Sequence, residues 1–164
     1  MKTINLKTFN IIGFALFTIL LVFIFSIFLG ACKKDTTTAL RTKEIILNPT
    51  TGTTISGKAV ITENVNHSFN INITLQNTVK DSVMVMHIHN GSIVLPINIA
   101  ISLSSIKGTG TQATGSTLNI ASGISPTGTT INLNYDSIIK PSRYFNVHFS
   151  AAQIKRVVAN GNIQ

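Results

Sequence analysis

His67-Ser68-Phe69-Asn70-Ile71-Asn72-Ile73-Thr74-Leu75 alternates apolar and polar side chains from Phe69 onward. Successive side chains of a β-strand point to opposite faces, so the phenylalanine, the isoleucines and the leucine would share one face. The same period of two returns at Arg143–Phe149. Such alternation is typical of strands that bury one face against a core. His67 has the same parity as Phe69, so we expect its side chain to point to the edge of that core.

The chain from Glu44 onward repeats this pattern as short apolar runs separated by Gly, Asn, Pro and Ser. Turn signals at intervals of about 8–12 residues predict an all-β fold, an antiparallel β-sandwich or barrel of about 7–8 strands. No segment has a convincing helical period, although 151–159 could form a short helical turn. The Thr/Ser-rich stretches 50–54 and 108–115 are expected to be exposed loops. The predicted strands are 55–63, 67–75, 82–89, 93–103, 117–120, 129–135, 143–149 and a last one at 154–158 or 162–163.

The N-terminal part is dominated by an apolar run, Ile11–Leu29, which follows Lys2 and Lys7 and leads into Leu29-Gly30-Ala31-Cys32. This arrangement resembles a bacterial lipoprotein signal, which implies cleavage before Cys32 and acylation of that cysteine, for example by palmitate. The alternative is an uncleaved anchor, because nineteen apolar residues can span a bilayer as a helix. Basic residues on both flanks of the run disfavour this alternative. Both interpretations place the rest of the chain outside the cytoplasm.

We therefore expect a signal peptide at 1–31, a lipidated tether at 32–42 and a β-domain at 43–164. Cys32 is the only cysteine, which excludes a disulfide framework. From Cys32 onward the chain has 11 basic and 5 acidic residues. The basic residues are scattered and are not interleaved with aromatic ones, so we expect no nucleic-acid partner.

Three of the four histidines lie in suggestive places, at His87-Ile88-His89 and at His148. Residues i and i+2 of a strand share a face, so His87 and His89 would lie opposite an apolar face that includes Ile88. If the strand holding His148 is a neighbour, all three imidazoles lie on the face away from the core and could bind one zinc or copper ion. Two alternatives stay open, namely structural histidines that bond loop carbonyls and histidines that contact a ligand without metal.

The same residues carry a family resemblance. Met86-His87-Ile88-His89-Asn90-Gly91 is similar to the His-Ile-His-x-Gly hallmark of the CHRD (chordin-related) domain family, and Tyr144-Phe145-Asn146-Val147-His148 is similar to its Tyr-Val-Asn-Val-His segment. The resemblance covers roughly Lys43 to the C-terminus and implies a divergent member with an immunoglobulin-like β-sandwich and binding roles. A weaker resemblance is to copper/zinc superoxide dismutase, whose bridging histidine and zinc ligands have no counterpart here, so no dismutase activity is expected.

No catalytic arrangement is visible in the sequence. The five acidic residues are dispersed, and no phosphate-binding loop, nucleophile elbow or cysteine-based metal pattern occurs. We therefore expect a non-enzymatic binding or structural module of the cell envelope, attached to a membrane through its N-terminal lipid, with an unidentified extracytoplasmic protein or polymer as partner and no cofactor. The alternative is a zinc- or copper-binding domain that uses His87, His89 and His148.

Overall fold

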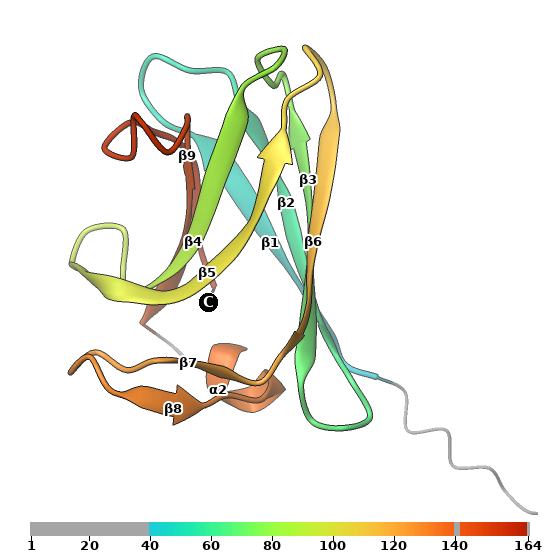
Figure 1. Ribbon diagram of the computed structural model, residues 1–164, viewed down its shortest axis with the longest axis vertical. Coiled ribbons are helices and arrows are strands. Elements are labelled where there is room, and N and C mark those ends of the chain that lie inside the picture. The colour runs from blue at the N-terminus through green and yellow to red at the C-terminus, as the bar shows by residue number, and fades with distance from the viewer. Residues whose placement is uncertain (1–39, 140–141, 164) are drawn as a thin grey trace, which may run out of the picture. The chain divides into compact units, whose positions relative to one another are not determined.

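The computed structural model describes residues 40–139 and 142–163. Residues 39–164 form one compact unit, which is nearly all β (Figure 1). Every strand pair is antiparallel, which confirms the predicted fold class. In the part of the chain that the structure describes, no helix is both long and apolar enough to cross a membrane. The predicted signal and most of the predicted tether lie outside the described residues.

Eight strands form the main sheet, and a separate hairpin and one short helix complete the unit. The hairpin consists of β7 (Ser122–Ile124) and β8 (Thr130–Asn132), and the helix is α2 (Tyr135–Ile139). In spatial order the strands of the main sheet are β5 (Pro96–Lys107), β4 (Val83–Gly91), β9 (Arg143–His148), β10 (Val157–Asn162), β1 (Thr42–Pro49), β2 (Ser56–Glu63), β3 (Phe69–Gln76) and β6 (Ala113–Ile120).

The main sheet curls until its two edge strands, β5 and β6, approach each other (Figure 1). The backbone N–H of Ser104 in β5 donates a hydrogen bond of 2.8 Å to Oγ1 of Thr117 in β6. The two halves of the sheet thus enclose one apolar core, as the two layers of a sandwich do. The predicted sandwich is therefore built by a single sheet that folds over itself into a nearly closed barrel.

The alternation in the sequence places the core side chains. In β3, Phe69, Ile71, Ile73 and Leu75 are all buried, while the residues between them are half-buried or exposed. In β9, Phe145 and Val147 are completely buried on the inner face. Burial of such large apolar side chains is the main favourable term of folding, at about 25 cal/mol for each Å² removed from water.

His67 lies elsewhere than the sequence predicts. It is exposed and has a positive φ of 66°, in the turn that precedes β3. The turn is closed by hydrogen bonds, including one of 3.0 Å from the His67 N–H to the Asn64 carbonyl. The parity of β3 does not extend into this turn, so the expectation of a core-facing His67 is wrong.

Other differences concern elements that the sequence pattern does not predict. β1 and β7 are additional strands, and the predicted loop at 108–115 ends at Ala113, where β6 begins. The segment 151–159 is no helix, because 151–155 form a bend and turns and 157–159 belong to β10. The predicted strand 129–135 is shortened to β8, since Asn134 starts α2 by accepting a hydrogen bond of 2.8 Å from the Ser137 N–H.

Candidate metal centre

The pairing of β4 with β9 brings the three histidines together on one face of the sheet. In the register of this pair, His148 lies opposite Val85, Asn146 opposite His87, and Tyr144 opposite His89. Directly opposite residues share a face, so all three imidazoles project from the outer side of the sheet, away from the core. Strand parity predicts this outer face, and the three imidazoles come together because β4 and β9 are neighbours in the sheet.

The three imidazoles are close enough to share one ion. Their ring centroids are 5.2 Å apart for His87 and His148, 5.8 Å for His87 and His89, and 6.2 Å for His89 and His148. One ring nitrogen from each residue lies within 4.8 Å of the other two. Tetrahedral zinc, with Zn–N bonds of about 2.0–2.1 Å, holds its donors about 3.4 Å apart. Small rotations of the side chains would therefore bring the nitrogens into coordination distance.

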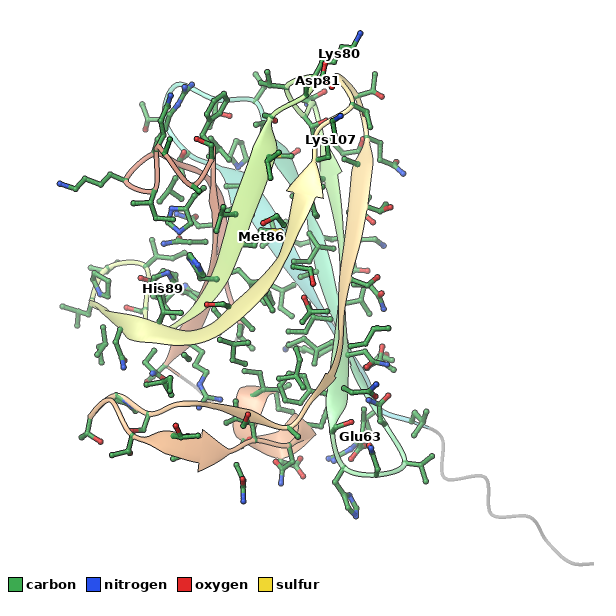
Figure 2. All side chains as sticks on the ribbon, in the orientation of Figure 1. Glu63, Lys80, Asp81, Met86, His89 and Lys107 are labelled. Atoms are coloured by element: carbon green, nitrogen blue, oxygen red, sulfur yellow. The ribbon has the colours of Figure 1, made fainter. Side chains whose placement is uncertain are left out.

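The cluster is buried although it lies on the outer face of the sheet. Only 7% of His87 and 5% of His148 are exposed, and His89 is half-buried. The backbone of Ile97, just after the β4–β5 loop, bonds His89, and the backbone of Ile154, in the β9–β10 connection, lies near His148. Figure 2 shows His89 beside the β4–β5 loop. Two loops therefore shield the site from water.

Local backbone features hold the β4–β5 loop in place. The β4–β5 pairing shifts register on both sides of His89, and such irregularities redirect side chains near functional sites. Gly91 follows with a φ of +89°, and a Cβ there would collide with the Leu95 carbonyl oxygen. The Gly91 N–H also donates a hydrogen bond of 2.6 Å to the carbonyl of Ser142. Glycine is therefore required where the chain turns over the histidines.

Four nitrogens of the cluster are buried without any hydrogen-bond partner. They are Nδ1 of His87, Nε2 of His89, and both ring nitrogens of His148. More than about 90% of buried polar groups in proteins have a partner, so four exceptions in one place need a physical reason. Backbone groups of Ile97 and Ile154 do approach His89 and His148 from the two loops, as expected for structural histidines. The four nitrogens make no hydrogen bond of normal geometry, so each histidine can still offer one nitrogen to a metal ion.

The environment keeps the imidazoles neutral. Burial, with smaller contributions from the neighbouring His148 and His89, lowers the pKa of His87 to about 4. The pKa of His89 is lowered by burial and then by His148, against a backbone hydrogen bond with Ile97 that raises it. Burial also lowers the pKa of His148, although the Ile154 backbone acts in the opposite direction. Neutral imidazole is the form that coordinates a metal ion.

The surroundings of the cluster contain an aromatic ring but no carboxylate ligand. The Tyr144 ring stacks on His89, with centroids 5.1 Å apart and planes inclined by 21°. Strand parity places Tyr144 on the face of His148, but the sequence alone assigns it no role at the site. The four carboxylates in the described residues form ion pairs with lysine or arginine. Three imidazoles alone leave at least one coordination position for water or another ligand.

The remaining predicted site residue, Cys32, lies outside the described residues. Comparisons of the chain with protein-family models, with curated proteins and with solved structures found no match. The geometry of the histidine cluster therefore carries the functional argument, and the resemblance to the CHRD family stays a hypothesis.

Proposed function

We propose that this domain binds one zinc or copper ion through His87, His89 and His148. The observation that supports the proposal best is the group of buried ring nitrogens without hydrogen-bond partners, contributed by all three histidines. Imidazole is a ligand for both metals, and copper(II) binds nitrogen sites more tightly than zinc does. We propose binding without catalysis, since no carboxylate or cysteine of the described residues joins the three histidines.

Calorimetric titration of residues 39–164 with zinc and with copper(II) tests this proposal. We expect saturable binding of one ion per chain, with a dissociation constant below about 10 μM. Each of His87→Ala, His89→Ala and His148→Ala should weaken binding by at least about tenfold. His67→Ala is the matched control, because His67 is exposed and lies outside the cluster. Its binding should equal that of the wild type.

The pH dependence of binding separates the buried cluster from adventitious surface histidines. Protons compete with the metal, and an ordinary histidine is half protonated at about pH 6.5. Because the pKa of His87 is near 4, binding should persist when the pH falls to about 5.5. No saturable binding, or equal loss of binding in His67→Ala, would contradict the proposed site. Circular dichroism of each variant shows whether it is folded.

For the whole chain we propose attachment to a membrane of the cell envelope, on the extracytoplasmic side, through a lipid on Cys32. Leu29-Gly30-Ala31-Cys32 at the end of an apolar run supports this proposal. A lipid-anchored domain of this kind would act as a binding or structural module for an extracytoplasmic protein or polymer. Cys32→Ala should abolish incorporation of labelled fatty acid and leave a larger, unprocessed precursor. Unchanged labelling and size in the variant would contradict the anchor.

A further inference from the structure

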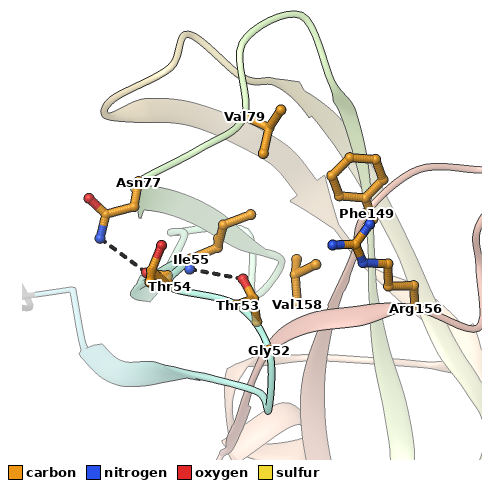
Figure 3. A pocket seen from close by; sticks show the side chains of 9 residues that line it. All are labelled: Gly52, Thr53, Thr54, Ile55, Asn77, Val79, Phe149, Arg156 and Val158. Atoms are coloured by element: carbon orange, nitrogen blue, oxygen red, sulfur yellow. Dashed lines mark hydrogen bonds between the residues drawn. The ribbon is translucent and has the colours of Figure 1, made fainter.

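A second potential site lies at one end of the curled sheet, where a cavity of about 440 Å³ opens. Its volume falls within the range of small-molecule sites, about 300–1,000 Å³, and the mouths of β-barrels are common places for such sites. The cavity lies among the β1–β2 connection, the β3–β4 connection and the ends of β9 and β10 that meet there (Figure 3). Its lining residues are Gly52, Thr53, Thr54, Ile55, Asn77, Val79, Phe149, Arg156 and Val158.

The cavity has an apolar floor and a polar rim. Ile55 and Val158 lie beneath it in the hydrophobic core, and the apolar side chains that keep exposed surface are those of the half-buried Phe149 and of Val79, which is 46% exposed. On the rim, the Asn77 amide donates a hydrogen bond of 3.0 Å to the Thr54 carbonyl, and the Ile55 N–H donates one of 3.0 Å to Thr53 Oγ1 (Figure 3). These bonds fix the rim, so the cavity is formed without a ligand.

Arg156 supplies a positive charge to this cavity. Its guanidinium carbon lies 4.4 Å from the centroid of the Phe149 ring, and Figure 3 shows the group beside that ring, facing the cavity. Its one side-chain hydrogen bond in the described structure is a long one of 3.5 Å to Oε1 of Gln153. A guanidinium has five N–H donors in a planar fork that matches a carboxylate. Stacking on Phe149 orients this exposed guanidinium, and most of its donors face solvent.

None of the ion pairs in the described residues involves Arg156. In the described residues, the ion pairs of Glu63 and Asp136 go to Arg41, and those of Glu44 and Asp81 go to Lys58 and Lys107. A preformed cavity with an apolar floor and an arginine without a carboxylate partner is complementary to an amphiphilic anion. Charge-assisted bidentate hydrogen bonds would hold the acidic group, and the accessible surface of Phe149 and Val79 would contact the apolar part.

We propose that this cavity binds a small organic anion, with its acidic group on Arg156 and an apolar, ring-bearing body against Phe149 and Val79. The proposal does not rest on the metal centre, because none of the three histidines lines the cavity, although both sites border on the β9–β10 connection.

Fluorescence titration with two matched probes tests the proposal on residues 39–164. The anionic probe is 8-anilinonaphthalene-1-sulfonate, and N-phenyl-1-naphthylamine has the same rings without the sulfonate. We expect saturable binding of the anion at one site, at least about tenfold tighter than binding of the neutral probe. Arg156→Gln should remove that difference by weakening only the anion. Val79→Phe, which fills the cavity, should weaken both probes.

Two control variants distinguish binding in the cavity from binding elsewhere on the domain. Lys155→Gln removes the same charge next to Arg156 but lies outside the lining, so its affinity should stay within about twofold of the wild type. Val94→Ser removes an apolar side chain that is 85% exposed on the β4–β5 loop, and it should leave binding unchanged. Equal affinity of Arg156→Gln and wild type for the anion would overturn the proposal. An equal loss in Lys155→Gln, or a loss in Val94→Ser but not in Val79→Phe, would also overturn it.

Discussion

The metal-free domain should lose stability between about pH 7.5 and pH 5, because its buried histidines resist protonation. The pKa of His87 is about 4 in the folded state and about 6.5 in the unfolded chain. Between these values the unfolded chain binds more protons, so stability is complete above pH 6.5 and falls as the pH decreases. For His87 alone the loss at pH 5 is about 2 kcal/mol. The lowered pKa values of His89 and His148 act in the same direction.

Urea denaturation of residues 39–164 in the presence of a chelator measures this effect. The free energy of unfolding at several pH values should decrease by at least about 2 kcal/mol from pH 7.5 to pH 5. Carboxylates whose pKa is lowered in the fold, such as Glu63, lose their contribution mainly at lower pH, which keeps the two effects apart. His87→Gln removes the titrating group and should flatten the profile, whereas His67→Ala should not. A flat wild-type profile over this range would refute the claim that burial holds these pKa values down.

Three further predictions concern the elements that hold the site. Phe145→Ala should lower the free energy of unfolding, measured by urea denaturation, by about 3–5 kcal/mol, because Phe145 is completely buried in β9. A loss below about 1 kcal/mol would mean that the core is assigned wrongly. Gly91→Ala should lower the free energy of unfolding by more than about 1 kcal/mol and weaken metal binding, since the φ of Gly91 is +89° and a Cβ there would meet the Leu95 carbonyl. Unchanged metal binding would show that the loop does not hold the site. Asn90→Ala should lower the free energy of unfolding by about 1–3 kcal/mol, because the buried Asn90 amide donates 2.9 Å hydrogen bonds to Ile124 and Asn98. No measurable loss would show that water replaces the Asn90 amide.

The fold could be predicted from the sequence where one face of a strand meets the core. β3 and β9 have this property, and their alternation identifies both the strands and the buried side chains. β1 was missed because Ile46 is 57% exposed between two buried residues, which turns an alternation into a continuous apolar run. α2 was missed because five residues are too few to display a helical period, and its start depends on the Asn134 cap.

The candidate site could be predicted only in part, for a related reason. Strand parity determines which face His87, His89 and His148 occupy, and that is a local property. Their convergence depends on β4 and β9 being neighbours, although more than fifty residues separate them in the chain. Their burial depends on two loops whose conformations local sequence patterns do not specify. The convergence and the burial of the three histidines therefore follow from topology and loop structure, which strand parity does not determine.

The energetic cost of the histidine cluster is itself an argument for a ligand. Each buried nitrogen without a partner has lost its hydrogen bonds to water and regained none in the protein, which destabilises the metal-free fold. Nothing in the sheet requires histidine there, because β4 and β9 pair through their backbones and Ile88 and Phe145 form the inner face. A bound ion would restore stability by about 2.7 kcal/mol at a hundred times its dissociation constant. The domain should therefore melt at a temperature that rises with free metal concentration, and this increase should vanish when His148, which offers one nitrogen to the cluster, is replaced by alanine.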